Sequence, residues 1–320
     1  MSFELILPFL RPIEPLLLDE SISEIMGNPD ASWWYERDGI IRREETISFA
    51  AGKLRTGLEV IANQLGKKLD EDNPILHAQL PDGSRLAAVI PPVVRLTPAL
   101  VIRKFTSRHY TVDDLIARGT LTHPLADFLA EQIRGGKTLL ISGGTGTGKT
   151  TLLRILADFI PEQERLVVIE DTSELQIQKP NILAVECQTD TFKANITFDD
   201  LLKSALRWRP DRIILGEVRG IEARTLLDSF NTGHAGSLAT IHANSAEKAL
   251  HRFANLVMRN HAQTTFSDTE AEIAEAVDFV VHVERQPGRR VREVLALRGY
   301  DRDAKRFLIE PVFEVKHVAT

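Results

Sequence analysis

A glycine-rich stretch near the middle of the chain constrains the fold more than any other part of the sequence. Residues 143–150 read GGTGTGKT, which fits the pattern G-x-x-x-x-G-K-[ST] of loops that hold nucleotide phosphates. The β-prone residues 138–142 precede this loop, and residues 151–157 carry apolar side chains at helical spacing. Strand, glycine turn and helix therefore follow one another in the order that a phosphate loop requires. A flexible loop that merely begins a helix is the poorer interpretation.

The motif predicts which groups of the loop meet a nucleotide. Its glycines allow backbone N–H groups to face a phosphate, and the helix N-terminus adds positive potential. Lys149 is expected to reach the β- and γ-phosphates, and the Thr150 hydroxyl is expected to ligate Mg²⁺. The expected nucleotide-binding residues of the loop are Gly144, Thr145, Gly146, Thr147, Gly148, Lys149, Thr150 and Thr151. We therefore expect the chain to bind a nucleoside triphosphate together with Mg²⁺.

Length and composition limit the remaining possibilities. The 320 residues suffice for two domains, and a hydrophobic content of 43% is ordinary for a globular protein. The net charge of −6 gives no support to bulk binding of nucleic acid, so direct nucleic-acid binding is not expected. Cys187 is the only cysteine, which excludes an internal disulfide and a multi-cysteine zinc site. The sequence shows no export signal or membrane-spanning run, which predicts a cytoplasmic protein with at most peripheral membrane contact.

Changes in residue pattern divide the chain into two expected domains. Residues 1–105 combine two hairpins with an amphipathic helix and are expected to form a small α+β domain with an antiparallel sheet. Residues 106–122 are polar and are expected to form an interdomain linker that contains a short helix at 112–117. Strands and helices alternate from residue 123 to residue 320, which predicts an α/β domain with a mostly parallel sheet covered by helices.

The expected elements follow from hydrophobic periodicity and turn residues. In the first domain we expect helices at 21–26 and 48–65, and strands at 32–37, 40–42, 76–80, 85–90 and 100–105. In the second we expect strands at 138–142, 165–169, 212–215, 237–241, 279–283 and 291–297, with a final antiparallel segment to 315. The expected helices there are 125–133, 151–157, 198–208, 221–230, 246–258 and 271–276, and the stretch to about Cys187 is expected to be irregular.

Candidate catalytic residues stand at the ends of three predicted parallel strands, because ligands bind at the carboxyl edge of such a sheet. These strands end in Glu170, in Gly216-Glu217 and in His242. A carboxylate at Glu217 can hold Mg²⁺ through water or orient the attacking water, and Glu170 can take one of these roles. Gly216 occupies a place where Asp is usual. The alternative is that one of the acids caps a helix or pairs with Arg219.

Two histidines bracket the strand predicted at 237–241. A lone histidine is usually a structural residue, but His234 and His242 flank a strand of a nucleotide-binding domain and are candidates for sensing the γ-phosphate. His242 is the stronger candidate, as a polar link between the phosphate and moving elements.

Three arginines cluster around the strand that ends in Glu217. Phosphoryl transfer needs positive charge at the γ-phosphate, often supplied by a neighbouring subunit. At least one of Arg207, Arg209 and Arg219 is therefore expected to act as an arginine finger. A surface ion pair is the alternative for each of them.

Four motifs together resemble the type II/type IV secretion ATPases, the traffic ATPase superfamily. They are the phosphate loop, an acidic box EDTSE at 170–174, IILGEVRG at 213–220 and TGHAGSLATIHANS at 232–245, which is similar to the family's histidine box. Gly216 is normal in this family. The motifs cover about residues 138–259, with weaker similarity at 81–92 and 102–104. Within the superfamily the chain looks most like the TrbB-type conjugative-transfer ATPases, followed by the CpaF-type pilus ATPases.

The resemblance implies a RecA-like P-loop ATPase domain behind a smaller N-terminal domain, in a homohexamer with nucleotide between the two domains. Arg103, with Arg85 and Lys104, becomes a candidate for closing the first domain over the phosphates. The implied protein is a Mg²⁺-dependent ATPase motor, docked at the cytoplasmic face of the inner membrane, that works with membrane and cytoplasmic components of a conjugation or type IV secretion machine. A pilus-assembly ATPase, a nucleotide-gated scaffold with little turnover and a nucleic-acid translocase are the alternatives.

Overall fold

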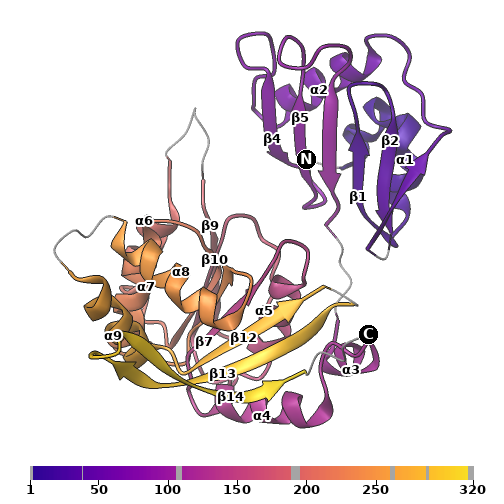
Figure 1. Ribbon diagram of the computed structural model, residues 1–320. Helices are drawn as coiled ribbons and strands as arrows, with labels where there is room; N and C mark the ends of the chain where they lie inside the picture. Colours follow the sequence, from indigo (N-terminus) through magenta and orange to yellow (C-terminus); the bar gives the residue numbers. More distant parts are fainter. Residues whose placement is uncertain are drawn as a thin grey trace. The chain divides into compact units, whose positions relative to one another are not determined.

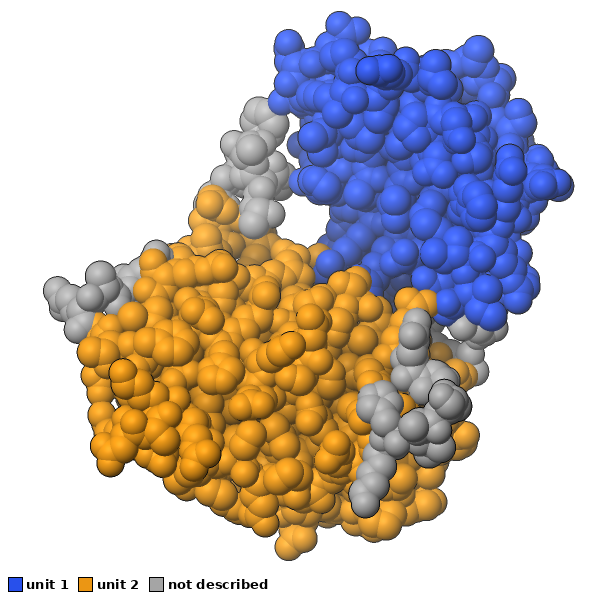
Figure 2. Space-filling view, in the orientation of Figure 1, with its two compact units in different colours: residues 1–108 blue, residues 109–320 orange. Residues whose placement is uncertain are grey.

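The chain forms two compact units, Met1–Arg108 and His109–Thr320 (Figure 2). The computed structural model describes residues 3–37, 39–105, 110–188, 195–259, 264–285 and 288–315. The division between the units falls inside the stretch 106–122 that the sequence suggested as a linker. None of the helices in the described ranges is long and apolar enough to cross a bilayer.

Unit 1 is a six-stranded antiparallel sheet in the order β3-β2-β1-β6-β5-β4 (Figure 1). Its strands are β1 Ile22–Gly27, β2 Trp33–Arg37, β3 Ile40–Glu44, β4 Ile75–Gln79, β5 Arg85–Val89 and β6 Ala99–Arg103. Its helices are α1 Glu14–Leu18 and α2 Lys53–Gln64, preceded by the short 3₁₀ turns η1 Phe3–Leu5, η2 Leu7–Phe9 and η3 Arg11–Ile13. The predicted small α+β domain with an antiparallel sheet is confirmed.

Alternation along the strands of unit 1 separates a covered face from an open one. In β6, Leu100 and Ile102 are buried against apolar residues of α2 such as Leu58 and Ile61. Arg103, one residue on, lies on the opposite, uncovered face. The sheet therefore buries one face and exposes the other.

One prediction in unit 1 is wrong. Residues 21–26, expected as a helix, form strand β1, and the helix of this region is α1, which comes earlier. Strand β1 pairs with β2 on one edge and with β6 on the other, and its Ile22 and Ile25 are fully buried. Backbone pairing on both edges outweighs the weak helical preference of the segment. Asp38, expected in the turn between β2 and β3, lies outside the described residues.

Unit 2 is built on an eight-stranded sheet in the order β14-β13-β12-β7-β11-β10-β8-β9. Neighbours from β12 to β9 pair in parallel, and β13 and β14 add an antiparallel edge, which confirms the predicted mostly parallel sheet. The strands are β7 Leu139–Gly143, β8 Leu166–Glu170, β9 Ile182–Glu186, β10 Arg212–Val218, β11 Leu238–His242, β12 Phe279–Glu284, β13 Arg290–Asp301 and β14 Arg306–Glu314. Strand β9 was expected to be irregular; it is a short, partly exposed edge strand without clear alternation.

Helices cover both faces of the sheet in unit 2 (Figure 1). They are α3 Val112–Ala117, α4 His123–Arg134, α5 Lys149–Ala157, α6 Phe198–Ala205, α7 Glu222–Asn231, α8 Ala246–Met258 and α9 Phe266–Ala276. Leu166 and Val168 of β8 belong to the apolar core that contains residues of α3, α4 and α5, whereas Val167 and Ile169 belong to the core that contains residues of α6, α7 and α8. Burial on both faces explains why the central strands are continuous apolar runs.

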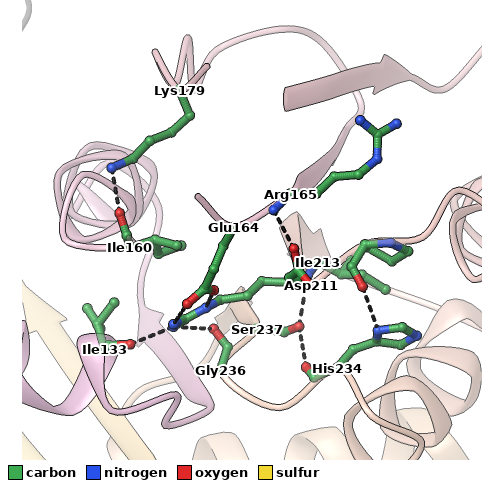
Figure 3. Close-up of polar contacts among 12 residues, drawn as sticks. Ile133, Ile160, Glu164, Arg165, Lys179, Asp211, Ile213, His234, Gly236 and Ser237 are labelled. Carbon is green, nitrogen blue, oxygen red and sulfur yellow. Dashed lines mark hydrogen bonds and ion pairs between the residues drawn. The ribbon is translucent and has the colours of Figure 1, made fainter. Parts of the chain in front are cut away.

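A buried arginine ties together the amino ends of the strands (Figure 3). Arg212, at the start of β10, is 2% exposed, and its guanidinium forms an ion pair with Glu164, with Nη2 at 2.8 Å from Oε1. It also donates to the backbone carbonyl oxygens of Ile133 and Gly236. A β-carbon on Gly236 would lie 2.8 Å from Nη1 of Arg212, so only glycine fits there. The opposite, carboxyl edge of the sheet remains for function.

We predict that Arg212→Ala lowers the free energy of unfolding by about 3–5 kcal/mol, because it leaves Glu164 and two backbone carbonyl groups without their buried donor. Urea denaturation measures this loss. Arg298→Ala is the control, since Arg298 and its partner Glu310 are both more than half exposed and their pair contributes less than about 1 kcal/mol. Equal stability of the two variants would contradict the assignment.

Candidate functional site

The phosphate loop connects β7 to α5, and close approach shapes its first residue. A β-carbon on Gly143 would lie 2.5 Å from the carbonyl oxygen of Val283 and 2.6 Å from Oγ1 of Thr147, so any side chain would collide. Gly146 and Gly148 adopt positive φ angles of 70° and 94°, which glycine reaches at no steric cost. Three of the four glycines of the motif thus have a backbone reason for being there, which is close approach at Gly143 and positive φ at Gly146 and Gly148.

Lys149 is the first residue of α5, and its side chain folds back over the loop. Its Nζ atom donates to the carbonyl oxygen of Gly144 at 2.7 Å, and Thr147 Oγ1 donates to the same oxygen at 3.0 Å. A neutral carbonyl is a weaker partner for an ammonium group than a phosphate oxygen is. A phosphate bound at the loop would therefore be a stronger partner for the Lys149 ammonium group than the carbonyl oxygen of Gly144 is.

Strand order brings three predicted residues to the same edge. Strand β11 lies directly beside β7, with His242 paired to Gly143 at the phosphate loop. Strand β10 is next and carries Glu217, and β8 follows with Glu170 at its end. With about 4.8 Å between neighbouring strands, the two acids sit roughly 10 and 14 Å along the sheet from β7. Glu217 is the carboxylate nearer to the loop.

His242 is held in the neutral form. Burial lowers the pKa of its imidazole, and the positive charge of Lys149 lowers it further, against an opposing effect of Glu217. A neutral imidazole at pH 7 offers one donor and one acceptor nitrogen. His242 therefore lies within electrostatic range of both the phosphate loop and the nearer acid, and it adds no positive charge.

Glu217 is fixed by an arginine two residues along the chain. Arg219 donates from Nε and Nη2 to the same oxygen, Oε2, at 2.9 and 2.8 Å, and from Nη1 to Asp171 at 3.1 Å. The ion pair raised as an alternative for Arg219 is thus present in this structure. It leaves half of the arginine side chain exposed and orients the carboxylate of Glu217 at the sheet edge.

Glu170 has a different environment. Its side chain is 5% exposed, and its Oε1 accepts from the backbone N–H groups of Glu174 and Leu175, both at 2.9 Å. Burial raises the pKa of Glu170 to about 7, although those two hydrogen bonds oppose the shift. A β-carbon at Gly216 would already touch Cγ of Glu170 at 3.4 Å, and an Asp there would add charge beside a buried carboxyl group. This explains glycine at a place where Asp is usual.

The raised pKa predicts a pH dependence of stability. Between an unfolded pKa near 4.5 and a folded pKa of about 7, the folded chain keeps a proton that the unfolded chain releases. Stability therefore falls as pH rises through this window, by about 2–3 kcal/mol between pH 5 and pH 8 from this group alone. Glu170→Gln removes that component. The free energy of unfolding of the variant, measured by urea denaturation, should therefore rise relative to that of the parent protein as pH rises. The exposed Glu275→Gln is the control; parallel stability curves for all three proteins would refute the shift.

Arg207, Arg209 and His234 lie at the amino edge of the sheet, before β10 and β11 begin. Arg207 is exposed and donates to the carbonyl oxygen of Lys203 at 3.0 Å. His234 Nδ1 is 3.2 Å from the carbonyl oxygen of Pro210 (Figure 3), a structural contact. The structure does not bring these residues together with the phosphate loop of their own chain. Arg207 or Arg209 could contact a phosphate loop only across a subunit interface.

The candidates in unit 1 form cross-strand contacts of their own. Arg103 pairs in register with Arg85, and its Nε lies 3.8 Å from Oε1 of Glu24. Lys104 turns inward, where its Nζ donates to the carbonyl oxygens of Asp19 at 2.6 Å and Leu16 at 3.3 Å. Lys104 therefore stabilises unit 1 itself, while Arg103 stays half-exposed on the open face of the sheet.

Strand β12 adds residues that the sequence did not indicate. It lies on the other side of β7, with Val283 level with Gly143. The buried His282 makes a 2.9 Å hydrogen bond between its Nδ1 and the hydroxyl of Ser142, one residue before the loop. After the strand, Arg289 donates to the carbonyl oxygen of Gly146. Only knowledge of the strand order would have drawn attention to them.

Comparison with known proteins assigns the family. The family model described as Type II/IV secretion system protein matches residues 10–307. The conjugal transfer protein TrbB of Rhizobium radiobacter is 38% identical over 88% of this chain and 85% of its own length. The type IV secretion system protein PtlH of Bordetella pertussis is 33% identical over 88% of this chain and 91% of its own.

A solved structure agrees with these relatives. The VirB11 ATPase of the Brucella suis type IV secretion system, in complex with sulphate, is 28% identical, with a TM-score of 0.50 over 90% of this chain and 93% of that chain. The expected fold, a RecA-like P-loop domain behind a smaller α+β domain, and the expected resemblance to TrbB-type proteins are confirmed. The chain belongs to the type II/IV secretion system protein family.

Proposed function

We propose that this chain is a Mg²⁺-dependent ATPase that energises a conjugation or type IV secretion machine. The observation that carries the proposal is the shared carboxyl edge of β7, β11 and β10, where a phosphate loop, a neutral histidine and an arginine-oriented carboxylate meet. The names of the relatives, a conjugal transfer protein and type IV secretion proteins, support the choice of machine.

In this proposal each residue has a role that follows from its position and charge. The backbone N–H groups of residues 144–151 and the ammonium group of Lys149 bind the phosphates. Glu217, nearer to the loop, orients the attacking water, and Arg219 holds the carboxylate of Glu217 in place. His242 accepts or donates one hydrogen bond near the γ-phosphate as a neutral group. Glu170, whose pKa burial raises to about 7, is a second acid, and positive charge at the site would shift it toward its ionised form.

The donor set fits a metal ion that arrives with the nucleotide. No group of three or more His, Cys, Asp or Glu side chains able to hold a metal occurs in the described ranges. Mg²⁺ commonly keeps several waters and takes its remaining ligands from phosphates and one or two protein oxygens. The Thr150 hydroxyl and the Glu217 carboxylate would supply those oxygens, with Glu170 as the alternative. When bound, Mg²⁺ offsets the negative charge of the phosphates.

We further propose that the active form is a homohexamer on the cytoplasmic face of the inner membrane. Hydrolysis would move unit 1 relative to unit 2, and Arg103 would help to close unit 1 over the phosphates. Arg207 and Arg209 cannot serve the phosphate loop of their own chain from the amino edge of the sheet, which makes them candidates for a neighbouring subunit. The partners would be membrane and cytoplasmic components of the same machine.

Two substitutions separate binding from turnover. Glu217→Gln should lower kcat by about 10²–10³-fold while the Kd for ATP stays within about threefold, because water orientation is lost and phosphate binding is kept. Lys149→Ala should raise that Kd by about tenfold or more, because a charge-assisted contact disappears. Steady-state ATPase rates and equilibrium binding of ATP measure both effects.

The control is Glu275→Gln, which makes the same chemical change at an exposed position of α9. Its kcat and Kd should equal those of the parent protein. If Lys149→Ala hydrolyses ATP as fast as the parent, the proposed active site is wrong. If Glu217→Gln does so, Glu217 does not orient the water.

A further inference from the structure

In the segment between β12 and β13, residues 285 and 289 lie against the phosphate loop. Because β12 is parallel to β7 and its Val283 is level with Gly143, the chain leaves β12 at the same edge at which the loop begins. It returns as β13, whose first residue Arg290 pairs with Glu284. Within this segment stand two further arginines, Arg285 and Arg289.

Both arginines reach the loop glycines. Arg289 donates from Nε to the carbonyl oxygen of Gly146 at 3.1 Å, and its Cδ lies 3.6 Å from the position that a β-carbon on Gly148 would occupy. Nη1 of Arg285 lies 3.3 Å from the corresponding position on Gly146. Side chains at these glycines would therefore meet the two arginines as well as require a strained φ.

Arg289 differs from its neighbour in what it is paired with. Arg290 forms an ion pair with Glu284, the last residue of β12, through Nη2 at 2.7 Å. Among the described residues, the hydrogen bond that Arg289 forms is to a neutral group, the carbonyl oxygen of Gly146, and its side chain is exposed. A guanidinium group gains more from a phosphate than from a carbonyl oxygen, because the phosphate carries negative charge and offers two oxygens to the planar guanidinium fork.

We propose that Arg289 binds the phosphate chain of the nucleotide in its own subunit, from the side of the loop opposite His242. Strands β11 and β12 flank β7 on its two sides, so His242 and Arg289 approach the loop from opposite directions. Lys149 is the cation that the loop itself supplies, and Lys149 and Mg²⁺ together leave part of the negative charge of a nucleoside triphosphate uncompensated. Arg289 supplies a second cation, and Arg285 adds to the positive potential.

The inference rests on the proposed nucleotide binding, and the test keeps the two apart. The Kd values of ADP and of the non-hydrolysable analogue AMP-PNP are measured by titration calorimetry with the full chain at several salt concentrations. Arg289→Gln should raise both Kd values by about tenfold and weaken their salt dependence, because one positive charge is lost. Arg289→Lys, which keeps the charge, should stay within about threefold of the parent.

Arg298→Gln is the matched control, since Arg298 is an exposed arginine on β13 whose recorded partner is Glu310. It should leave both Kd values unchanged. If Arg289→Gln binds both nucleotides as tightly as the parent, whatever the affinity of Arg289→Lys, then Arg289 only supports the backbone at Gly146 and the inference is overturned. If the parent itself binds neither nucleotide, the proposed function fails and the inference fails with it.

Discussion

The site depends on backbone pairing around strand β7. Because β7 is hydrogen-bonded in parallel to β11 on one side and to β12 on the other, Gly143 is level with both His242 and Val283. That register fixes the start of the phosphate loop against the carbonyl group of Val283, where a β-carbon would collide. At the amino ends of the strands, the buried Arg212 joins the starts of β10 and β11 to the end of α4, which fixes the position of these two strands relative to that helix.

Two acids at one edge have been given different properties by their surroundings. Glu217 is about a quarter exposed and is held in its orientation by Arg219, whereas burial raises the pKa of Glu170 to about 7. Gly216 of β10 makes room for this arrangement, because it lies against the side chain of Glu170 on the neighbouring strand. Carboxyl groups in such different surroundings are common where proton transfer and charge stabilisation are needed together.

Local pattern predicted what is encoded locally. The phosphate loop, the helices with a single apolar stripe and the buried strands that end in Glu170, Glu217 and His242 were all readable from spacing and residue type. Strand β1 was misread, because its strand character comes from pairing with β2 and β6 rather than from its own residues. His282 and Arg289 could not be found in this way, since more than a hundred residues separate them from their partners Ser142 and Gly146. The amino-edge position of Arg207 likewise followed from the direction of α6, which spacing alone does not give.

The most direct test of the account is turnover measured together with assembly. Sedimentation velocity and ATPase rate would be recorded on the same samples over a range of protein concentrations, with and without Mg²⁺ and ATP. The account predicts Mg²⁺-dependent hydrolysis that rises in proportion to the fraction of hexamer. A monomer with full activity would contradict the ring, and a hexamer that binds ATP without hydrolysing it would contradict the motor.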